Sequence, residues 1–171
     1  FCQVGYLWIA TKPEEMEIFR KNVALQNQRG LDVKLLTAAE VGKHAPYVRL
    51  DDVQGGTIHL KDGYAPPADY VMGYYKASKD LGVKYMLQTE MTGVLRQGNR
   101  AIGLKTSQGD IRAGKIVCAA GAFAGKVGDM VGIPIPVQPV RRQCFVTEPI
   151  PKLPHPIPMT IDYTTGVYMH S

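Results

Sequence analysis

The 171-residue sequence contains no apolar run of about 18 residues, the length needed to cross a bilayer. Its first ten residues alternate in polarity and do not form the apolar core of a signal peptide. Its first residue is Phe1, so we expect the chain to be the central part of a longer reading frame. We therefore expect a soluble protein that is cytoplasmic, or located in the mitochondrial matrix in a eukaryote.

Motifs of metal and nucleophilic chemistry are also lacking. The sequence has no C-x-x-C, H-E-x-x-H or G-x-S-x-G pattern and no dinucleotide-binding G-x-G-x-x-G. The three cysteines lie far apart in apolar contexts without metal-ligand spacing, which predicts buried, reduced thiols at Cys2, Cys118 and Cys144. The four histidines are isolated, so surface or structural roles are the simplest interpretation. We predict no metal site.

The net charge of +5 comes from 20 basic and 15 acidic residues that are scattered along the chain. No basic stripe with interleaved aromatic residues is present, which argues against a nucleic-acid partner. An anionic cofactor or a carboxylate substrate is compatible with this balance.

Helix and strand signals alternate along the chain, which is typical of an α/β to α+β fold. A capping box at 11–14 predicts a helix that ends near Arg29, and Thr37 to Glu40 predicts a second. A third helix follows Pro66 and Pro67, and its apolar spacing predicts a buried face. The residues of that face are Ala68, Val71, Met72 and Tyr75. Strands are predicted at 3–10, 33–36, 83–87, 91–96, 101–106, 110–113, 115–119 and 138–148, and a hairpin at 159–162 and 167–170.

The run from Ile116 to Phe123 is apolar and then changes to small residues. This pattern predicts a buried strand that enters a tight turn before a short helix at 122–131. A glycine at such a turn lets the backbone approach a ligand closely, and Gly121 holds that position. A plain strand-to-helix turn without a ligand is the alternative. Residue types alone support no more than an α/β domain.

Several short segments occur in a distinctive order: Gly5 to Trp8, Asp62 to Pro66, Thr89 to Val94, Ile116 to Phe123, Gly132 to Pro134 and Pro136 to Pro139. In this order and spacing the chain resembles the FAD-dependent amine and amino-acid oxidoreductases, a D-amino-acid-oxidase-like family. It is most similar to the branch with sarcosine oxidase and its β-subunit, dimethylglycine dehydrogenase and glycine oxidase. The resemblance covers essentially the whole chain.

The resemblance implies a central piece of a two-domain flavoenzyme, with a mixed-sheet substrate domain and part of a Rossmann-like FAD-binding domain. Residues 1–58 and 134–171 would belong to the substrate domain, and 59–133 to the FAD domain. It also implies FAD contacts from five residues, with Phe123 in place of the family's tryptophan. These residues are Met91, Ala119, Ala120, Gly121 and Phe123. We expect the isolated piece to bind FAD weakly or not at all and to be inactive.

For the substrate, the resemblance places Tyr168, and with less support His170, beside the flavin; a purely structural sheet aromatic is the alternative for Tyr168. The implied reaction is oxidation of a C–N bond in a sarcosine-like N-methyl amine or a simple amino acid. Two alternatives stay open. One is another flavoenzyme of this scaffold, acting on a hydroxy acid or glycerol phosphate or as a flavin hydroxylase. The other is a non-catalytic module of a hetero-oligomer. The implied partners are the substrate, the remainder of the polypeptide and further subunits of a homo- or hetero-oligomer.

Overall fold

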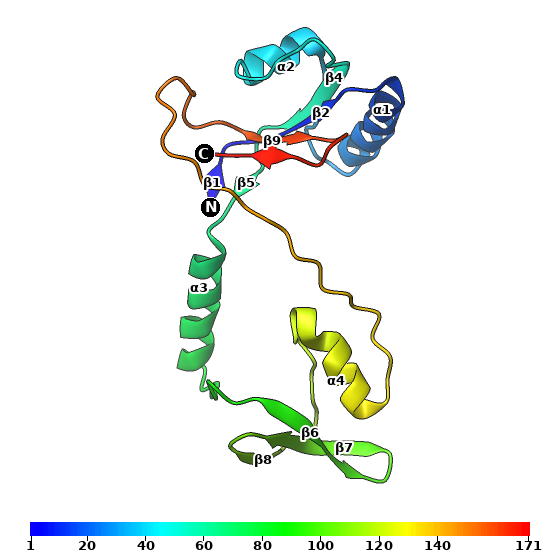
Figure 1. Cartoon of the computed structure of the whole chain (residues 1–171), viewed down its shortest axis with the longest axis vertical. Coiled ribbons are helices and arrows are strands. Elements are labelled where there is room, and N and C mark those ends of the chain that lie inside the picture. Colours follow the sequence, from blue (N-terminus) through cyan, green and yellow to red (C-terminus); the bar gives the residue numbers. More distant parts are fainter. The chain divides into compact units, whose positions relative to one another are not determined.

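The computed structural model describes all 171 residues, which form two compact units (Figure 1). Unit 1 comprises Phe1–Asp80 and Thr147–Ser171, and unit 2 comprises Leu81–Val146. The chain therefore leaves unit 1, forms unit 2 and returns. These units are defined by packing, so the ligand-binding roles predicted for 1–58, 59–133 and 134–171 stay predictions.

Unit 1 is built on a mixed five-stranded sheet with the order β10-β9-β2-β4-β3. The strands are β2 (Tyr6–Ala10), β3 (Lys34–Thr37), β4 (Gly55–His59), β9 (Met159–Asp162) and β10 (Tyr168–Met169). β2 pairs parallel with β9 and antiparallel with β4, while the outer pairs are antiparallel. The predicted mixed sheet is therefore confirmed. A central strand is covered on both faces, which explains why β2 is almost continuously apolar.

Helices α1 (Pro13–Gln28) and α2 (Ala38–His44) lie on opposite faces of this sheet. Two neighbouring glycines of β4 show this, because successive residues of a strand face opposite sides. A methyl group added to Gly55 would meet Met16 of α1, and one added to Gly56 would meet Val41 of α2. Both positions also lie within 2.5 Å of a backbone oxygen, so only glycine fits here.

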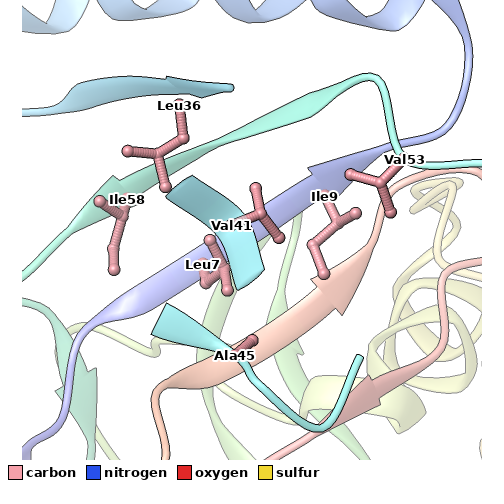
Figure 2. Close-up of a cluster of buried hydrophobic side chains, with 7 residues drawn as sticks. All are labelled: Leu7, Ile9, Leu36, Val41, Ala45, Val53 and Ile58. Carbon is pink, nitrogen blue, oxygen red and sulfur yellow. The ribbon is translucent and has the colours of Figure 1, made fainter. Parts of the chain in front are cut away.

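The main hydrophobic core lies between α2 and the sheet. Figure 2 shows Val41 of α2 and Ala45, which directly follows this helix, lying over side chains of the strands. Its buried members are Leu7, Ile9, Leu36, Val41, Ala45, Val53 and Ile58. A smaller cluster of Ala10, Met16 and Phe19 holds α1. Burial of a leucine or isoleucine side chain contributes about 1.5–3 kcal/mol, so this core carries much of the stability of unit 1.

The predicted capping boxes of α1 and α2 have different outcomes. At α2 the predicted capping box is confirmed, since the Thr37 hydroxyl accepts from the Glu40 N–H at 3.3 Å and Glu40 accepts from the Thr37 N–H at 2.8 Å. At α1 the prediction is wrong by one residue, because the capping carboxylate is Glu15 and not Glu14. Pro13 occupies the first helical position, so the helix begins later than the Thr11 signal suggested.

The remaining elements of unit 1 are β1 (Cys2–Gln3), β5 (Gly63–Tyr64) and α3 (Pro67–Asp80). β1 and β5 form a separate two-stranded antiparallel ladder. The predicted strand 3–10 is interrupted at Gly5, whose φ of +84° breaks the extended conformation. The predicted buried face of α3 is wrong for this chain, because no α3 residue is buried. Amphipathic spacing predicts a helix but not the presence of a surface that covers it.

Unit 2 contains a three-stranded antiparallel sheet of β6 (Met91–Gln97), β7 (Arg100–Thr106) and β8 (Gly109–Arg112). The first turn lies at Gly98–Asn99, as the sequence predicts, whereas the second lies at Ser107–Gln108, one residue before the predicted position, because Gly109 already pairs with Thr106. A 3₁₀ turn, η1 (Gly121–Phe123), leads into α4 (Ala124–Val131), which ends at left-handed Gly132. Arg96 donates to the Val131 carbonyl at 2.6 Å and ties α4 to β6.

Three predicted strands, at 83–87, 115–119 and 138–148, are wrong for this chain because those segments have no regular structure. A strand exists only where its backbone pairs, and no neighbouring strand lies beside these segments. Their apolar side chains are correspondingly exposed: Val117 is 87% and Val146 is 95% accessible. The predicted burial of the thiols is also wrong, since Cys2, Cys118 and Cys144 are free and exposed.

Leu7→Ala should strongly destabilise unit 1. Leu7 is fully buried at the centre of the α2 cluster, so its truncation leaves a cavity between α2 and the sheet. We expect the free energy of unfolding to fall by about 2–5 kcal/mol, measured by urea denaturation followed by circular dichroism. Leu25→Ala is the control because Leu25 is exposed on α1. Equal effects of the two changes would show that the cluster is not the core.

Candidate functional site

The candidate substrate residues lie in unit 1 and the candidate cofactor residues in unit 2. Tyr168 lies on β10 and His170 follows it, whereas Met91 opens β6 and residues 119–123 precede α4.

Tyr168 lies at the rim of a pocket of about 200 Å³ in unit 1. The floor is formed by Ile9 of β2 and Thr160 of β9, and the loop after α2 forms one side. Tyr168 pairs with Ile161 in the ladder and is 55% exposed, which leaves its ring accessible. The short edge strand β10 therefore presents this aromatic side chain toward solvent.

The pocket carries both signs of charge. Arg49 and Asp52 come from the loop after α2, and Asp162 comes from the end of β9. Arg49 also lies 3.3 Å from Asp51, but both side chains are highly exposed, so this ion pair contributes little. The pattern is suited to a small molecule that carries both a carboxylate and an amine. No sequence motif marks Arg49 or Asp52, so sequence reasoning missed them.

A partly buried hydrogen bond joins the loop after α2 to the pocket floor. The hydroxyls of Tyr47 and Thr160 are 2.8 Å apart, although the residues are 113 positions apart in sequence. The Thr160 hydroxyl also donates to the Pro158 carbonyl at 3.0 Å, so the Tyr47 hydroxyl donates to Thr160. Burial raises the pKa of the Tyr47 phenol above its usual value of 10, and the hydrogen bond with Thr160 only partly opposes this. Tyr47 is thus a neutral hydrogen-bond donor at neutral pH.

His170 lies outside the pocket lining. Its ring packs on Tyr64 of β5 with centroids 4.6 Å apart, and the Tyr64 hydroxyl donates to the Ser171 carbonyl. The structure therefore places His170 beside the β1–β5 ladder and Tyr168 at the pocket, and it does not bring these two side chains together in one pocket.

The candidate cofactor residues form an open surface of unit 2. Ala119 and Ala120 lead into η1, where Gly121 has a φ of +51° and the Phe123 N–H donates to the Ala120 carbonyl at 2.9 Å. No atom lies within 4 Å of a methyl group added to Gly121. Phe123 is 64% exposed, and the Lys126 ammonium lies 5.5 Å from its ring centroid.

The other candidate cofactor residue lies on β6, which packs against α4. Met91 is half-buried at the start of β6 and pairs with Thr106. Small residues and an accessible backbone fit one wall of a flavin site. They do not fit a complete site, because enclosed ligand sites bury most of the ligand surface and this one is open.

The sequence pattern of the family described as "FAD dependent oxidoreductase" matches residues 1–171. The chain belongs to this family. The resemblance inferred from the order of its short motifs is therefore confirmed, and so is the family's FAD-dependent, oxidoreductase character. None of the helices combines the length and apolar character needed to span a membrane.

Curated relatives in the family match over most of this chain. Sarcosine oxidase subunit beta of Rhodobacter capsulatus is 29% identical over 88% of this chain and 37% of its own length. Dimethylglycine dehydrogenase of Rattus norvegicus, a mitochondrial protein, is 27% identical over 99% of this chain and 20% of its own length.

A solved structure supports the same fold. The L-proline dehydrogenase of P. horikoshii has a TM-score of 0.83 and 26% identity over 99% of this chain and 46% of that chain. The flavoprotein chain described here thus spans less than half the length of each of these three relatives.

Tyr47→Phe should destabilise unit 1 in a pH-dependent way. Loss of the hydrogen bond to Thr160 should lower the free energy of unfolding by about 1 kcal/mol near neutral pH. Because the folded state raises the pKa of Tyr47, the unfolded chain ionises first, and the parent loses stability as pH rises above about 10. Urea midpoints at pH 8 and pH 10.5 should therefore differ less in the variant than in the parent. Tyr74→Phe, at an exposed position of α3, is the control. An unchanged pH dependence would contradict the assignment.

The isolated 171-residue chain should retain no flavin after incubation with FAD and desalting. The exposed wall around Gly121 and Phe123 offers a ring surface but little enclosure. Absorbance spectroscopy of the desalted protein measures this directly. A stable yellow protein would show that residues of this chain already form a complete cofactor site.

Proposed function

We propose that the chain acts within an FAD-dependent enzyme that oxidises the C–N bond of N-alkylated α-amino acids. The observation that carries this proposal is the chemistry shared by the relatives. Their names specify sarcosine, dimethylglycine and proline, and each of these is an α-amino acid with an alkylated nitrogen. Bound FAD would accept a hydride from the carbon next to nitrogen, and the imine product would hydrolyse in water.

Within this proposal, the pocket of unit 1 binds the substrate. Tyr168 presents an accessible ring, and the opposite charges of Arg49 and Asp52 suit the carboxylate and amine of an amino acid. His170 is the weaker candidate because its ring is packed on Tyr64. No residue is assigned as a general base; the amine is oxidised in its neutral form, after its proton has left.

The proposed cofactor contacts lie in unit 2. Met91 contacts the adenine through its backbone, and the run Ala119, Ala120, Gly121 and Phe123 lies beside the flavin. The open space at Gly121 and the 64% exposure of Phe123 support this assignment, because both leave room for a ligand.

We propose that polypeptide beyond these 171 residues covers the exposed apolar surface of α3. Tyr70, Val71, Met72 and Tyr74 are all exposed there, which is unusual for so many large apolar side chains on one helix. A further subunit is the other candidate, supported by the relative named as a subunit. The proposed location is cytoplasmic, or the mitochondrial matrix in a eukaryote.

Anaerobic flavin reduction in the whole protein tests the proposed reaction. Sarcosine, dimethylglycine and L-proline should bleach the visible absorption band of the oxidised flavin, while glycolate and glycerol 3-phosphate should not. Reduction by the latter two alone would favour the alternative flavoenzyme class. Absence of flavin from the whole protein would favour a non-catalytic module.

Substitution of Tyr168 tests, in the same assay, whether the pocket of unit 1 binds the substrate. Tyr168→Ala should raise the substrate concentration for half-maximal reduction about fivefold, because a ring contact is worth about 1 kcal/mol. Phe1→Ala, also at an exposed aromatic position, is the control. Equal behaviour of the two variants would remove Tyr168 from the site.

A further inference from the structure

The turn between β9 and β10 is fastened to the start of α1 by a buried carboxylate. The Thr164 hydroxyl lies 2.7 and 2.9 Å from the two carboxylate oxygens of Glu15, across 149 positions of sequence. Glu15 is only 7% exposed. Because the Thr164 hydroxyl donates to Glu15, the Thr11 hydroxyl, 2.6 Å away, donates to Thr164. The turn is thus linked to both sides of the helix start.

The Glu15 carboxylate is held in place by backbone N–H groups at the start of α1. Its carboxylate accepts from the N–H groups of Thr11 at 3.0 Å and Lys12 at 3.1 Å. Burial alone would raise the pKa of Glu15, but the hydrogen bonds from Thr164, Thr11 and Lys12 outweigh it and hold the pKa below its usual 4.5. At neutral pH Thr164 therefore meets a fixed, charged acceptor.

A second contact fastens the same turn. The Tyr163 ring packs edge-on against Phe19 of α1 at 5.2 Å and against Trp8 of β2 at 6.0 Å between centroids. The Tyr163 N–H also donates to the Ile9 carbonyl at 3.0 Å. Thr164 is thus held by hydrogen bonds to a carboxylate, and its neighbour Tyr163 is held by aromatic packing and a backbone hydrogen bond.

The turn is internally braced, so its position is passed on to β10. The Asp162 carboxylate accepts from the Thr164 N–H at 2.9 Å and the Thr165 hydroxyl at 2.5 Å. The Gly166 N–H donates to the Asp162 carbonyl at 2.8 Å, and the Asp162 N–H to the Val167 carbonyl at 2.9 Å. Tyr168 follows directly after this braced turn.

We propose that Glu15 and Tyr163 are positioning residues, which hold the β9–β10 turn on α1 and thereby fix Tyr168 at the rim of the unit 1 pocket. The importance of this position for substrate rests on the proposed function, but the clamp itself does not. β10 is a two-residue edge strand paired only with β9. The residues after it are held through His170 and Ser171, so the turn supplies the support on the N-terminal side of Tyr168.

Thr164→Val tests the clamp, since it removes the hydroxyl link while the helix cap from Glu15 to Thr11 and Lys12 remains. Hydrogen–deuterium exchange of the 171-residue chain should quicken about tenfold at the Asp162 and Gly166 amides, and less than about twofold in β2 and β4. Thr92→Val, at an exposed position of β6, is the matched control and should change neither region.

A ¹⁹F label at Tyr168 distinguishes a change in the position of this side chain from a general loss of stability. The ¹⁹F resonance of 3-fluorotyrosine at Tyr168 should broaden or shift in Thr164→Val and stay unchanged in Thr92→Val. An unchanged resonance, unchanged exchange at the turn, or equal acceleration throughout the sheet would each overturn the proposal. Neither measurement uses enzymatic activity, so failure here is distinct from failure of the proposed reaction.

Discussion

The parallel pairing of β2 with β9 is the interaction on which the rest of unit 1 depends. It joins Tyr6–Ala10 to Met159–Asp162, two segments at opposite ends of the sequence. Because β9 lies beside β2, the pocket floor combines Ile9 and Thr160, and the turn after β9 reaches α1. Loss of this one ladder would detach β9 and β10 from β2, and the pocket floor and the clamp would be lost together.

Local sequence signals predicted the elements whose contacts are local. The Thr37 cap, the hairpins of unit 2 and the end of α4 at Gly132 depend on residues a few positions apart, and all were confirmed. Failures arose where an element needs a distant neighbour. The apolar segments 115–119 and 138–148 have strand-like composition, but no strand lies beside them in this chain. The composition of a segment shows that it is suited to a buried strand. The segment forms that strand only where another strand lies beside it to pair with.

In the candidate site, too, the sequence pointed to some residues and missed those whose contacts join distant parts of the chain. Tyr168 and Gly121 were predicted as site residues because the order of several short motifs resembles a family; the family is confirmed, and the roles of these two residues stay predictions. Tyr47, Arg49 and Thr160 were missed because their meeting depends on a separation of more than 100 residues between the loop after α2 and β9. No motif or residue spacing in the sequence predicts a contact between positions so far apart. Likewise, the sequence signal pointed to Glu14, and both the capping role of Glu15 and its hydrogen bond with Thr164 were seen only in the folded chain.

The interleaved order of the two units also has a consequence for synthesis on the ribosome. β9 emerges about 150 residues after β2, which at roughly 5–20 residues per second is a delay of about 8–30 s. During that interval β2 has one paired edge, formed with β4, and one bare edge of N–H and C=O groups. The nascent chain therefore carries an open β-edge throughout the synthesis of unit 2, and this is the interval in which a chaperone would protect it.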